Sequence, residues 1–546
     1  MAHAEGQRVE PAIEMLASGV PWSSREAMDQ WLVPHLFGQA YLRKPPGMVW
    51  AIAASQATLG EHSPLRLSDT VASRLVSAFA TILGALIVYA FGSRWFGRVA
   101  GFIGGCAWAL FPVWYWYPPP ALSAEIEALN NLFVLATSLA LFDVLLWSRR
   151  REPSGRMTFF LAHAFLAITF AAMLLTKGPA GVPTLLAVMI ACVWGRAQNI
   201  TLRPAPRRDW LTVAAAFLYG ALVFVGWMFA ARSALARSGE TPVTQEFTQF
   251  LFTPKKLFGI VSLPVAAIIS ALPHTAFFSV FLRPSQALRA CIDPFVRQRA
   301  VLARAIAFAV VVGVLLSMLL GVSNSRYTLP TLALVPFVVG GACWWLLERA
   351  KQAESELKAQ ALCKSLTNTL VVLAAVLLIA CIGLGVYAEH RRTVRTTGET
   401  DGVRMGAAIV ANFQPGLPAD SRKGAALAEA FKKHPNSIIE LWGDEMLDIR
   451  PEIAMSAARE ARTHGLMIVP KWMPLSLVGT AGDNSLVPPL PAAGNFVLLR
   501  TDSKPREPGR IEELPAYERA GLMAQLRPVF KGTAHDFEYT LYVVVP

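Results

Sequence analysis

The sequence predicts a polytopic α-helical membrane protein of about 10–12 spans followed by a small C-terminal α/β domain. Hydrophobic residues make up 54% of the 546 residues and charged residues only 16%, whereas soluble globular domains carry about 25% charged residues. Long apolar runs recur, and about 20 helical residues cross the ~30 Å hydrocarbon core. Lys and Arg gather in alternate loops. These observations exclude a disordered chain, a fibrous repeat and an ordinary cytosolic enzyme.

The predicted bundle consists of apolar runs that are long enough, or nearly long enough, to cross a bilayer as helices. A shorter run at 46–60 follows Lys44-Pro45-Pro46 and is expected to lie at the interface or to enter the membrane partway. The full-length runs are 69–92, 98–116, 126–147, 157–175, 179–195, 209–231, 257–282, 299–321, 328–347 and 366–388.

The loops between these runs alternate in positive charge. One set of loops carries 19 Lys and Arg residues and the opposite set carries 6. The positive-inside rule therefore places the first set in the cytoplasm. We expect both the N-terminal segment and the tail after Tyr387 on the outer side. The richer set is 93–98, 148–156, 195–208, 283–304 and 348–364; the poorer set is 117–125, 176–178, 232–256 and 322–327.

The formal net charge of +13 would indicate nucleic-acid binding if the basic residues gathered on one water-soluble surface. They lie instead in short loops between apolar runs, so the expected partner is the lipid bilayer and not nucleic acid. The six cysteines fall in predicted spans or cytoplasmic loops. We therefore expect no disulfide in the C-terminal domain, and no cysteine spacing is typical of a metal site.

Three domains are predicted: an outer loop with amphipathic helices at 1–68, the helical bundle at 69–388 and an extracytoplasmic α/β domain at 389–546. In the last domain, alternating and β-branched runs indicate strands, and amphipathic runs indicate helices. The expected strands are 437–441, 466–469, 496–499 and 537–545; the expected helices lie near 419–433, 451–464 and 511–525.

Ionisable residues cluster where the predicted spans meet the outer side. Glu125 and Glu127 begin a span, Lys177 lies in a Gly-Pro turn, and Arg326 follows a Ser-Asn-Ser break. Such groups usually face a cavity or a partner. The structural alternatives are a helix dipole that favours acids and a lysine that snorkels to the interface. Together with Lys44, the cations could clamp a lipid phosphate and leave a carboxylate free to act as a base.

The order of several short segments resembles the GT-C glycosyltransferases, in particular the 4-amino-4-deoxy-L-arabinose lipid A transferases and the protein O-mannosyltransferases. The segments are Trp-Leu-Val-Pro-His-Leu at 31–36, Tyr-Leu-Arg-Lys-Pro-Pro at 41–46, Ser-Arg-Leu-Val-Ser-Ala at 73–78, Leu-Thr-Lys-Gly-Pro at 175–179 and Arg-Tyr-Thr-Leu-Pro at 326–330. The resemblance covers roughly residues 5–335.

This resemblance implies an inverting transfer of a hexose or pentose from a polyprenyl-phosphate donor. The acceptor would be a lipid, glycan or protein at the outer face of the bacterial inner membrane, as in lipid A modification or protein O-mannosylation. The family's catalytic Asp matches Glu5, Gly6 replaces its second acid, and its later acid matches Glu127 with Glu125 beside it. The family's first span should precede Glu5, so we expect an upstream start codon.

The resemblance also implies roles for the cations and aromatic residues. Lys44, Lys177 and Arg326 would hold the departing lipid phosphate, with Arg8 and Arg74 as weaker candidates for the same role. The aromatic run at 114–117 would stack on a sugar, line a lipid groove, or form an interfacial belt. Some GT-C enzymes use a divalent metal, although the sequence shows no ligand spacing for one. A lipid-linked-sugar transporter or flippase and a non-catalytic membrane scaffold are the alternative functions.

Overall fold

The structure is a computed structural model, and it describes most of the helical bundle together with parts of the N-terminal and C-terminal regions. The described residues are 3–17, 24–36, 39–42, 44–60, 63–111, 114, 123–147, 156–198, 207–238, 267–268, 271, 274–278, 281, 293–319, 325–351, 360–361, 364, 367–368, 371, 375, 379, 383, 386, 403–412, 438–443, 456–458, 460–461, 464, 466–472, 494–500, 521–534 and 537–545.

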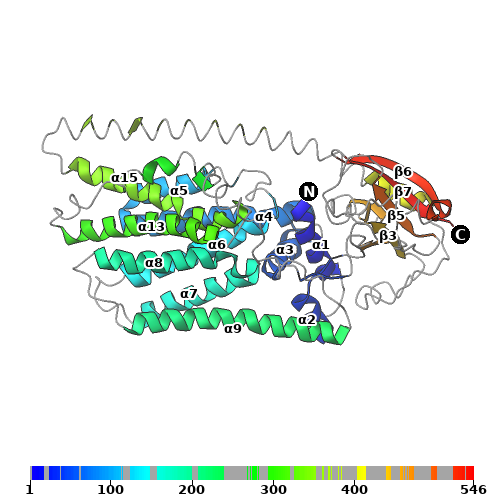
Figure 1. Cartoon of the computed structure of the whole chain (residues 1–546), viewed down its shortest axis with the longest axis horizontal. Coiled ribbons are helices and arrows are strands. Elements are labelled where there is room, and N and C mark those ends of the chain that lie inside the picture. The colour runs from blue at the N-terminus through cyan, green and yellow to red at the C-terminus, as the bar shows by residue number, and fades with distance from the viewer. Residues whose placement is uncertain are drawn as a thin grey trace.

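Three short helices precede the bundle and lie across one of its ends (Figure 1). They are α1 (His3–Ala17), α2 (Arg25–Leu32) and α3 (Gly47–Leu59), with a small hairpin of β1 (His35–Leu36) and β2 (Gln39–Ala40) between α2 and α3. Ser24 caps α2, because its hydroxyl accepts a hydrogen bond from the Ala27 amide at 3.0 Å. We refer to this end of the bundle as the α1–α3 end.

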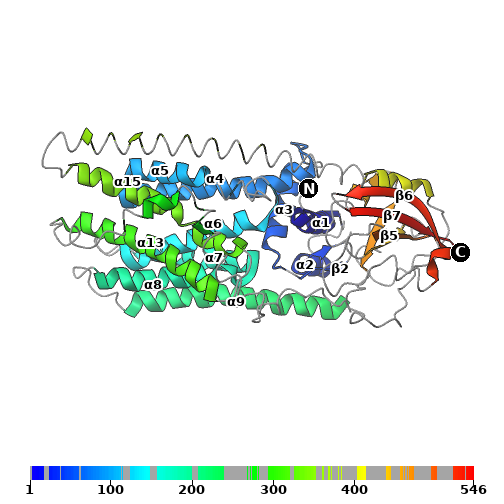
Figure 2. The ribbon, with the colours of Figure 1, turned by 45° about the horizontal axis from the view of Figure 1, so that its top comes forward.

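The bundle itself is built from long helices that run back and forth (Figures 1 and 2). Helix α6 continues into a π-helical turn, and α7 and α8 are joined by a 3₁₀ turn. The bundle elements are α4 (Asp69–Phe96), α5 (Arg98–Ala109), α6 (Ile126–Phe142), η2 (Asp143–Trp147), α7 (Arg156–Lys177), η4 (Gly178–Gly181), α8 (Val182–Gln198), α9 (Arg207–Ser238), η5 (His274–Phe278), α13 (Pro294–Leu319), η6 (Ser325–Thr328), α14 (Leu329–Leu332) and α15 (Val335–Lys351).

Six stretches within the described residues are long and apolar enough to cross a membrane, which confirms a membrane-spanning helical fold. One of them contains both α7 and α8, which were predicted as two spans. The predicted run at 98–116 contains α5, a helix of only 12 residues. The predicted runs at 257–282 and 366–388 lie largely outside the described residues. The six stretches are Asp69–Phe96, Ile126–Trp147, Phe160–Gln198, Asp209–Ser238, Phe295–Leu319 and Arg326–Lys351.

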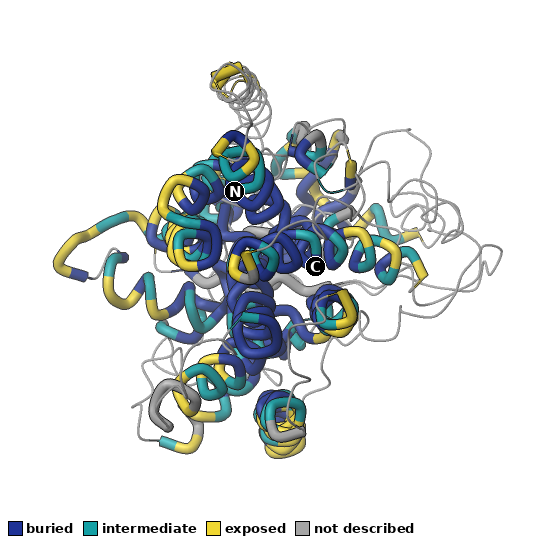
Figure 3. Tube along the Cα trace, turned by 90° about the vertical axis from the view of Figure 1, so that its left-hand side faces the viewer, coloured by how far each residue is buried: buried dark blue, intermediate teal, exposed yellow. Residues whose placement is uncertain are grey.

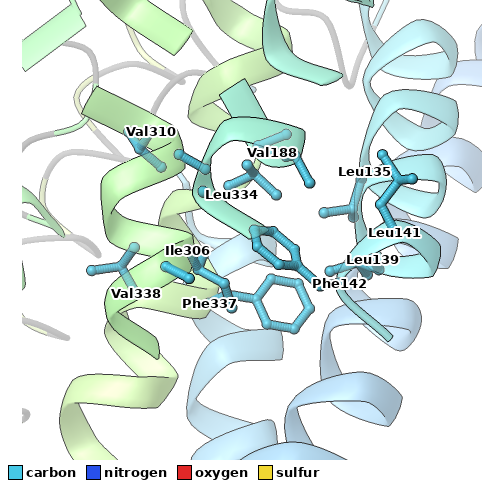
Figure 4. Close-up of a cluster of buried hydrophobic side chains, with 14 of the residues drawn as sticks. Leu135, Leu139, Leu141, Phe142, Val188, Ile306, Val310, Leu334, Phe337 and Val338 are labelled. Carbon is cyan, nitrogen blue, oxygen red and sulfur yellow. The ribbon is translucent and has the colours of Figure 1, made fainter. Parts of the chain in front are cut away.

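Helix α6 lies in the interior of the bundle, since 89% of the apolar window of its span is buried. Its side chains Leu135 and Phe142 pack towards Phe337 of α15 and Ile306 of α13 (Figure 4). Figure 3, which looks along the bundle, shows buried segments at the centre and exposed segments around the outside. A polar side chain on α6 is therefore remote from bulk water, and it needs a partner inside the protein.

The C-terminal region contains a five-stranded sheet in the order β4-β3-β5-β7-β6. The predicted strands are found as β3 (Ile438–Gly443), β4 (Met467–Trp472), β5 (Phe496–Arg500) and β7 (Phe537–Val544). Strands β3, β4 and β5 are parallel, and β7 runs antiparallel to β5. The sheet lies beyond the α1–α3 end of the bundle (Figures 1 and 2).

One strand of this sheet was not predicted, namely β6 (Leu526–Ala534), which pairs with β7. Its Pro528 and Gly532 argue against a strand in the sequence. The structure explains Pro528, because β6 is an edge strand and its register shifts between Pro528 and Phe530. It explains Gly532 by close packing, because a Cβ there would lie 2.6 Å from the Tyr539 ring. Of the predicted helix at 511–525, the described part is a short 3₁₀ turn (Leu522–Gln525). The predicted helix at 419–433 lies outside the described residues.

Candidate functional site

The strongest candidate site begins with a buried ion pair at the α1–α3 end. Glu127 lies in the first turn of α6 and Lys177 at the last residue of α7, and Lys177 Nζ lies 3.1 Å from Glu127 Oε1. Both side chains are less than a tenth exposed. A helix start favours an acid and a helix end favours a base, so each charge lies where the helix dipole stabilises it. The two residues are 50 positions apart in the sequence.

The second cation of the site comes from a turn before α14. Arg326 and Tyr327 belong to η6, and Arg326 lies within electrostatic range of the Glu127 carboxylate. Lys177 Nζ lies 5.1 Å from the centre of the Tyr327 ring, which is the geometry of a cation–π contact. The segments around Lys177 and Arg326, which are separate loops in the sequence, therefore converge on Glu127.

The third cation, Arg8, comes from α1. Its Nη1 donates a hydrogen bond of 2.9 Å to the hydroxyl of Tyr41, which in turn donates to Gln7 Oε1 at 3.2 Å. Burial alone would lower the pKa of Arg8. The nearby Tyr41, Glu125 and Glu127 more than offset burial and raise that pKa above its ordinary value. Arg8 is therefore a fixed positive charge close to both carboxylates.

The segment that contains Lys44 is held against the end of α7 by close backbone packing. A Cβ at Gly47 would lie 2.7 Å from the carbonyl oxygen of Leu175, and Pro45 Cγ lies 3.9 Å from where a Cβ of Gly178 would be. Gly178 also has a φ of +63°, which glycine adopts readily. This packing sets Lys44, three residues before Gly47, beside the turn that follows Lys177. The side chain of Lys44 is half-buried.

Glu125 lies at the start of α6 and is anchored through its backbone. Ser77 of α4 donates a hydrogen bond of 3.2 Å to the Glu125 carbonyl, and Glu125 is buried. Arg74 precedes Ser77 by one helical turn and is half-buried. The neighbouring Ser73 bonds to Gln56 of α3 at 3.0 Å, which joins this part of α4 to the N-terminal helices.

The structure adds neither the Glu5 side chain nor Trp114 to this cluster. Glu5 lies in α1 one turn before Arg8, but its side chain lies outside the described residues. Trp114 is buried in the bundle interior, where its indole donates to the Trp108 carbonyl at 2.9 Å. Trp114 is therefore a core residue and does not belong to an interfacial belt, whereas residues 115–117 lie outside the described residues.

The site has few side chains that could bind a divalent metal. In the part of the chain that the structure describes, no three or more His, Cys, Asp and Glu side chains form a group that could hold a metal ion. One oxygen of the Glu127 carboxylate already pairs with Lys177. These residues do not fit a metal-binding set.

No protein-family model and no curated protein sequence matches the chain. Among solved structures, the chain is similar to ArnT from Cupriavidus metallidurans in the apo state, with a TM-score of 0.56. It is also similar to the same protein bound to undecaprenyl phosphate, with a TM-score of 0.53. In both cases the identity is 15%, and the match covers 98% of this chain and 93% of the other. The chain therefore has a GT-C-like fold.

The sequence named the charged residues that lie together here, but it did not indicate the contacts of two tyrosines. Tyr41 bonds to Arg8, and Tyr327 lies against Lys177. Both tyrosines occur in segments that carry the GT-C resemblance, directly before Leu-Arg-Lys and directly after Arg326. Their contacts span 33 residues and about 150 residues of sequence, so periodicity gives no signal for them.

Proposed function

We propose that the protein transfers a sugar from a polyprenyl-phosphate donor to a lipid, glycan or protein acceptor. The observation that carries this proposal is the buried pair Glu127–Lys177, joined by Arg326 and Arg8 at one end of a membrane-spanning bundle. Buried charges that converge in this way are typical of functional sites. The likeness to ArnT bound to undecaprenyl phosphate supports a lipid phosphate as the ligand.

The cations would hold the donor's phosphate. Lys177 contacts the carboxylate of Glu127, and Arg326 and Arg8 lie within electrostatic range of it. The packing of Gly47 holds the segment that contains Lys44 against the end of α7. As the bond between the sugar and the phosphate breaks, negative charge grows on the phosphate, and preorganised cations stabilise that charge. Arg74 is a further candidate from α4. Lysine would act as a point charge, and arginine would bind two oxygens at once.

The carboxylates would take the proton of the acceptor hydroxyl and orient that hydroxyl. In the proposed displacement, the acceptor oxygen bonds to the anomeric carbon as the bond from that carbon to the phosphate oxygen breaks. The configuration at the anomeric carbon is inverted. The acceptor's proton passes to a carboxylate, for which we propose Glu5 in α1, and the lipid phosphate departs. Glu127 would orient the acceptor hydroxyl, because one of its oxygens, Oε2, has no hydrogen-bond partner among the described residues.

The proposed topology places this site at the outer face of a bacterial inner membrane. The loop charges support that orientation, since 19 Lys and Arg residues lie on one set of loops and 6 on the other. In this orientation the α1–α3 end and the C-terminal sheet are extracytoplasmic, and the predicted boundaries at 68 and 388 separate the outer loop, the bundle and the C-terminal domain.

The test is transfer of radiolabel by the purified protein in lipid nanodiscs. Radiolabelled polyprenyl-phosphate sugars are mixed with native membranes as the source of acceptor. Glu5→Gln is expected to lower the rate about 10²–10⁴-fold, and Lys44→Ala is expected to weaken donor use. The control is Arg94→Gln at the opposite end of α4, where Arg94 pairs with Asp143 at 3.2 Å.

Each outcome decides between the functions. Loss of transfer in Glu5→Gln with normal transfer in the Arg94 control supports the proposal. Normal transfer by Glu5→Gln removes Glu5 as the base. Movement of the lipid-linked sugar across a vesicle without product formation would show a transporter, and binding without turnover of any polyprenyl-phosphate sugar would show a scaffold.

A further inference from the structure

Two adjacent buried asparagines on α6, Asn130 and Asn131, have no partner in the described structure. Both are fully buried, and neither the oxygen nor the nitrogen of either side-chain amide has a hydrogen bond to any described residue. Buried amides almost always have partners. In a membrane-spanning bundle the requirement is stricter, because water is not freely available to pair with them. Two neighbouring exceptions on an interior helix therefore call for a ligand.

The unpaired groups lie on the same side of α6 as the carboxylate of the site. Asn130 and Asn131 follow Glu127 by three and four residues, which places all three on one face of the helix. Asn131 is about 6 Å further along the helix axis than Glu127. The second oxygen of Glu127 and the hydroxyl of Ser138, seven residues beyond Asn131, also have no partner among the described residues. A line of unpaired polar atoms thus leads from the ion pair into the bundle.

The described helices around α6 supply no hydrogen-bond partner for Asn130 or Asn131. Helix α6 packs against α7, α8, η4 and α14, the elements that carry or adjoin Lys177 and Arg326. Across from α6, Thr184 of α8 and Thr331 of α14 hydrogen-bond to each other at 2.7 Å. On the same helix, Thr137 is satisfied by the Phe133 carbonyl and by Thr169 of α7. These threonines are paired, whereas both polar atoms of Asn130 and of Asn131 are unpaired.

We propose that Asn130 and Asn131 bind hydroxyl groups of the sugar carried by the donor, a proposal that rests on the proposed function. An amide offers two donors and an acceptor without charge, which matches a hydroxyl and not a phosphate. The phosphate is expected at the cations, and the sugar must lie next to both the phosphate and the carboxylates. Asn130 and Asn131 are one helical turn from Glu127, so a ring placed there reaches all three groups.

The test compares lipids with and without a sugar. Binding of undecaprenyl phosphate and of undecaprenyl phosphates that carry a hexose or a pentose is measured in nanodiscs without acceptor. Asn130→Leu and Asn131→Leu are each expected to lower affinity for the sugar-bearing lipid by up to about tenfold. Affinity for undecaprenyl phosphate itself should not change. Thr137→Val on the same helix is the matched control and should keep the preference for the sugar.

Thermal unfolding separates a binding role from a structural one. Leucine has the same branching and number of side-chain heavy atoms as asparagine and leaves no unpaired group, so both leucine variants should unfold at the wild-type temperature or above it. A lower unfolding temperature would show that the amides stabilise the fold, for example through bound water, and would overturn the inference.

The remaining outcomes separate this inference from the proposed function. If the wild type binds undecaprenyl phosphate but prefers no sugar, or if the leucine variants keep the wild-type preference, the inference is wrong and the phosphate site stands. If the leucine variants keep wild-type lipid binding and, in the radiolabel-transfer assay, change only the KM for acceptor, the assignment to the donor sugar is wrong. If the wild type binds none of these lipids, the proposed function itself fails.

Discussion

Replacing Gly47 by alanine tests how the N-terminal helices position the site. A Cβ at this position would lie 2.7 Å from the Leu175 carbonyl oxygen, 3.0 Å from its carbon and 3.1 Å from the Thr176 nitrogen. All three are backbone atoms, so no side-chain rotation can relieve the overlap, and α3 must move away from α7. Overpacking of this kind costs about 1–3 kcal/mol.

The same movement would carry Lys44 away from Lys177. We therefore expect Gly47→Ala to lower the unfolding temperature and to reduce the transfer rate at least about tenfold, since small misplacements of binding groups are costly. Thermal unfolding in detergent and transfer of radiolabel measure the two effects. The control is Gly226→Ala in α9, where an added Cβ meets nothing within 4 Å. If both alanine variants unfold and transfer like the wild type, the packing argument is wrong.

The remaining predictions concern the charges of the site. Lys177→Met or Glu127→Leu alone leaves a buried charge without its partner and should destabilise the protein by about 3–5 kcal/mol. The double variant should regain much of that stability and still transfer no sugar. If the double variant instead loses the sum of the two single losses in free energy of unfolding, the buried pair is refuted. Tyr41→Phe removes the hydroxyl that accepts a hydrogen bond from Arg8 at 2.9 Å. It should lower the free energy of unfolding by about 1.5–3 kcal/mol and weaken binding of the donor lipid. Unchanged unfolding and unchanged binding of undecaprenyl phosphate would contradict this role.

The sequence predicted the features that depend on local pattern. The apolar runs predicted the helices that contain Glu127 and Lys177, and the positions of these residues at opposite helix ends follow from the same runs. Alternating residues predicted four of the strands, whereas the edge strand with Pro528 was missed because edge position is a property of the whole sheet. Local pattern thus determines the type and the ends of each helix or strand, whereas tertiary packing determines which of them lie side by side.

Features that depend on distant contacts could not be predicted. Nothing in the local sequence brings Tyr41 to Arg8, or places Gly47 against the backbone of Leu175, because these contacts form only when α1, α3 and α7 pack. Asn130 and Asn131 are visible in the sequence within an apolar run. Their lack of partners becomes evident only when the packing around α6 is known.

The central claim is that the charges around Glu127 and Lys177 bind and activate a polyprenyl-phosphate sugar. Its most direct test measures the transfer of radiolabel from such donors to native-membrane acceptors by purified wild-type protein and by the folded Lys177→Met, Glu127→Leu double variant. We predict that label leaves the donor with the wild type and stays on the donor with the double variant. No transfer by folded wild type from any donor, or equal transfer by both proteins, would contradict the claim.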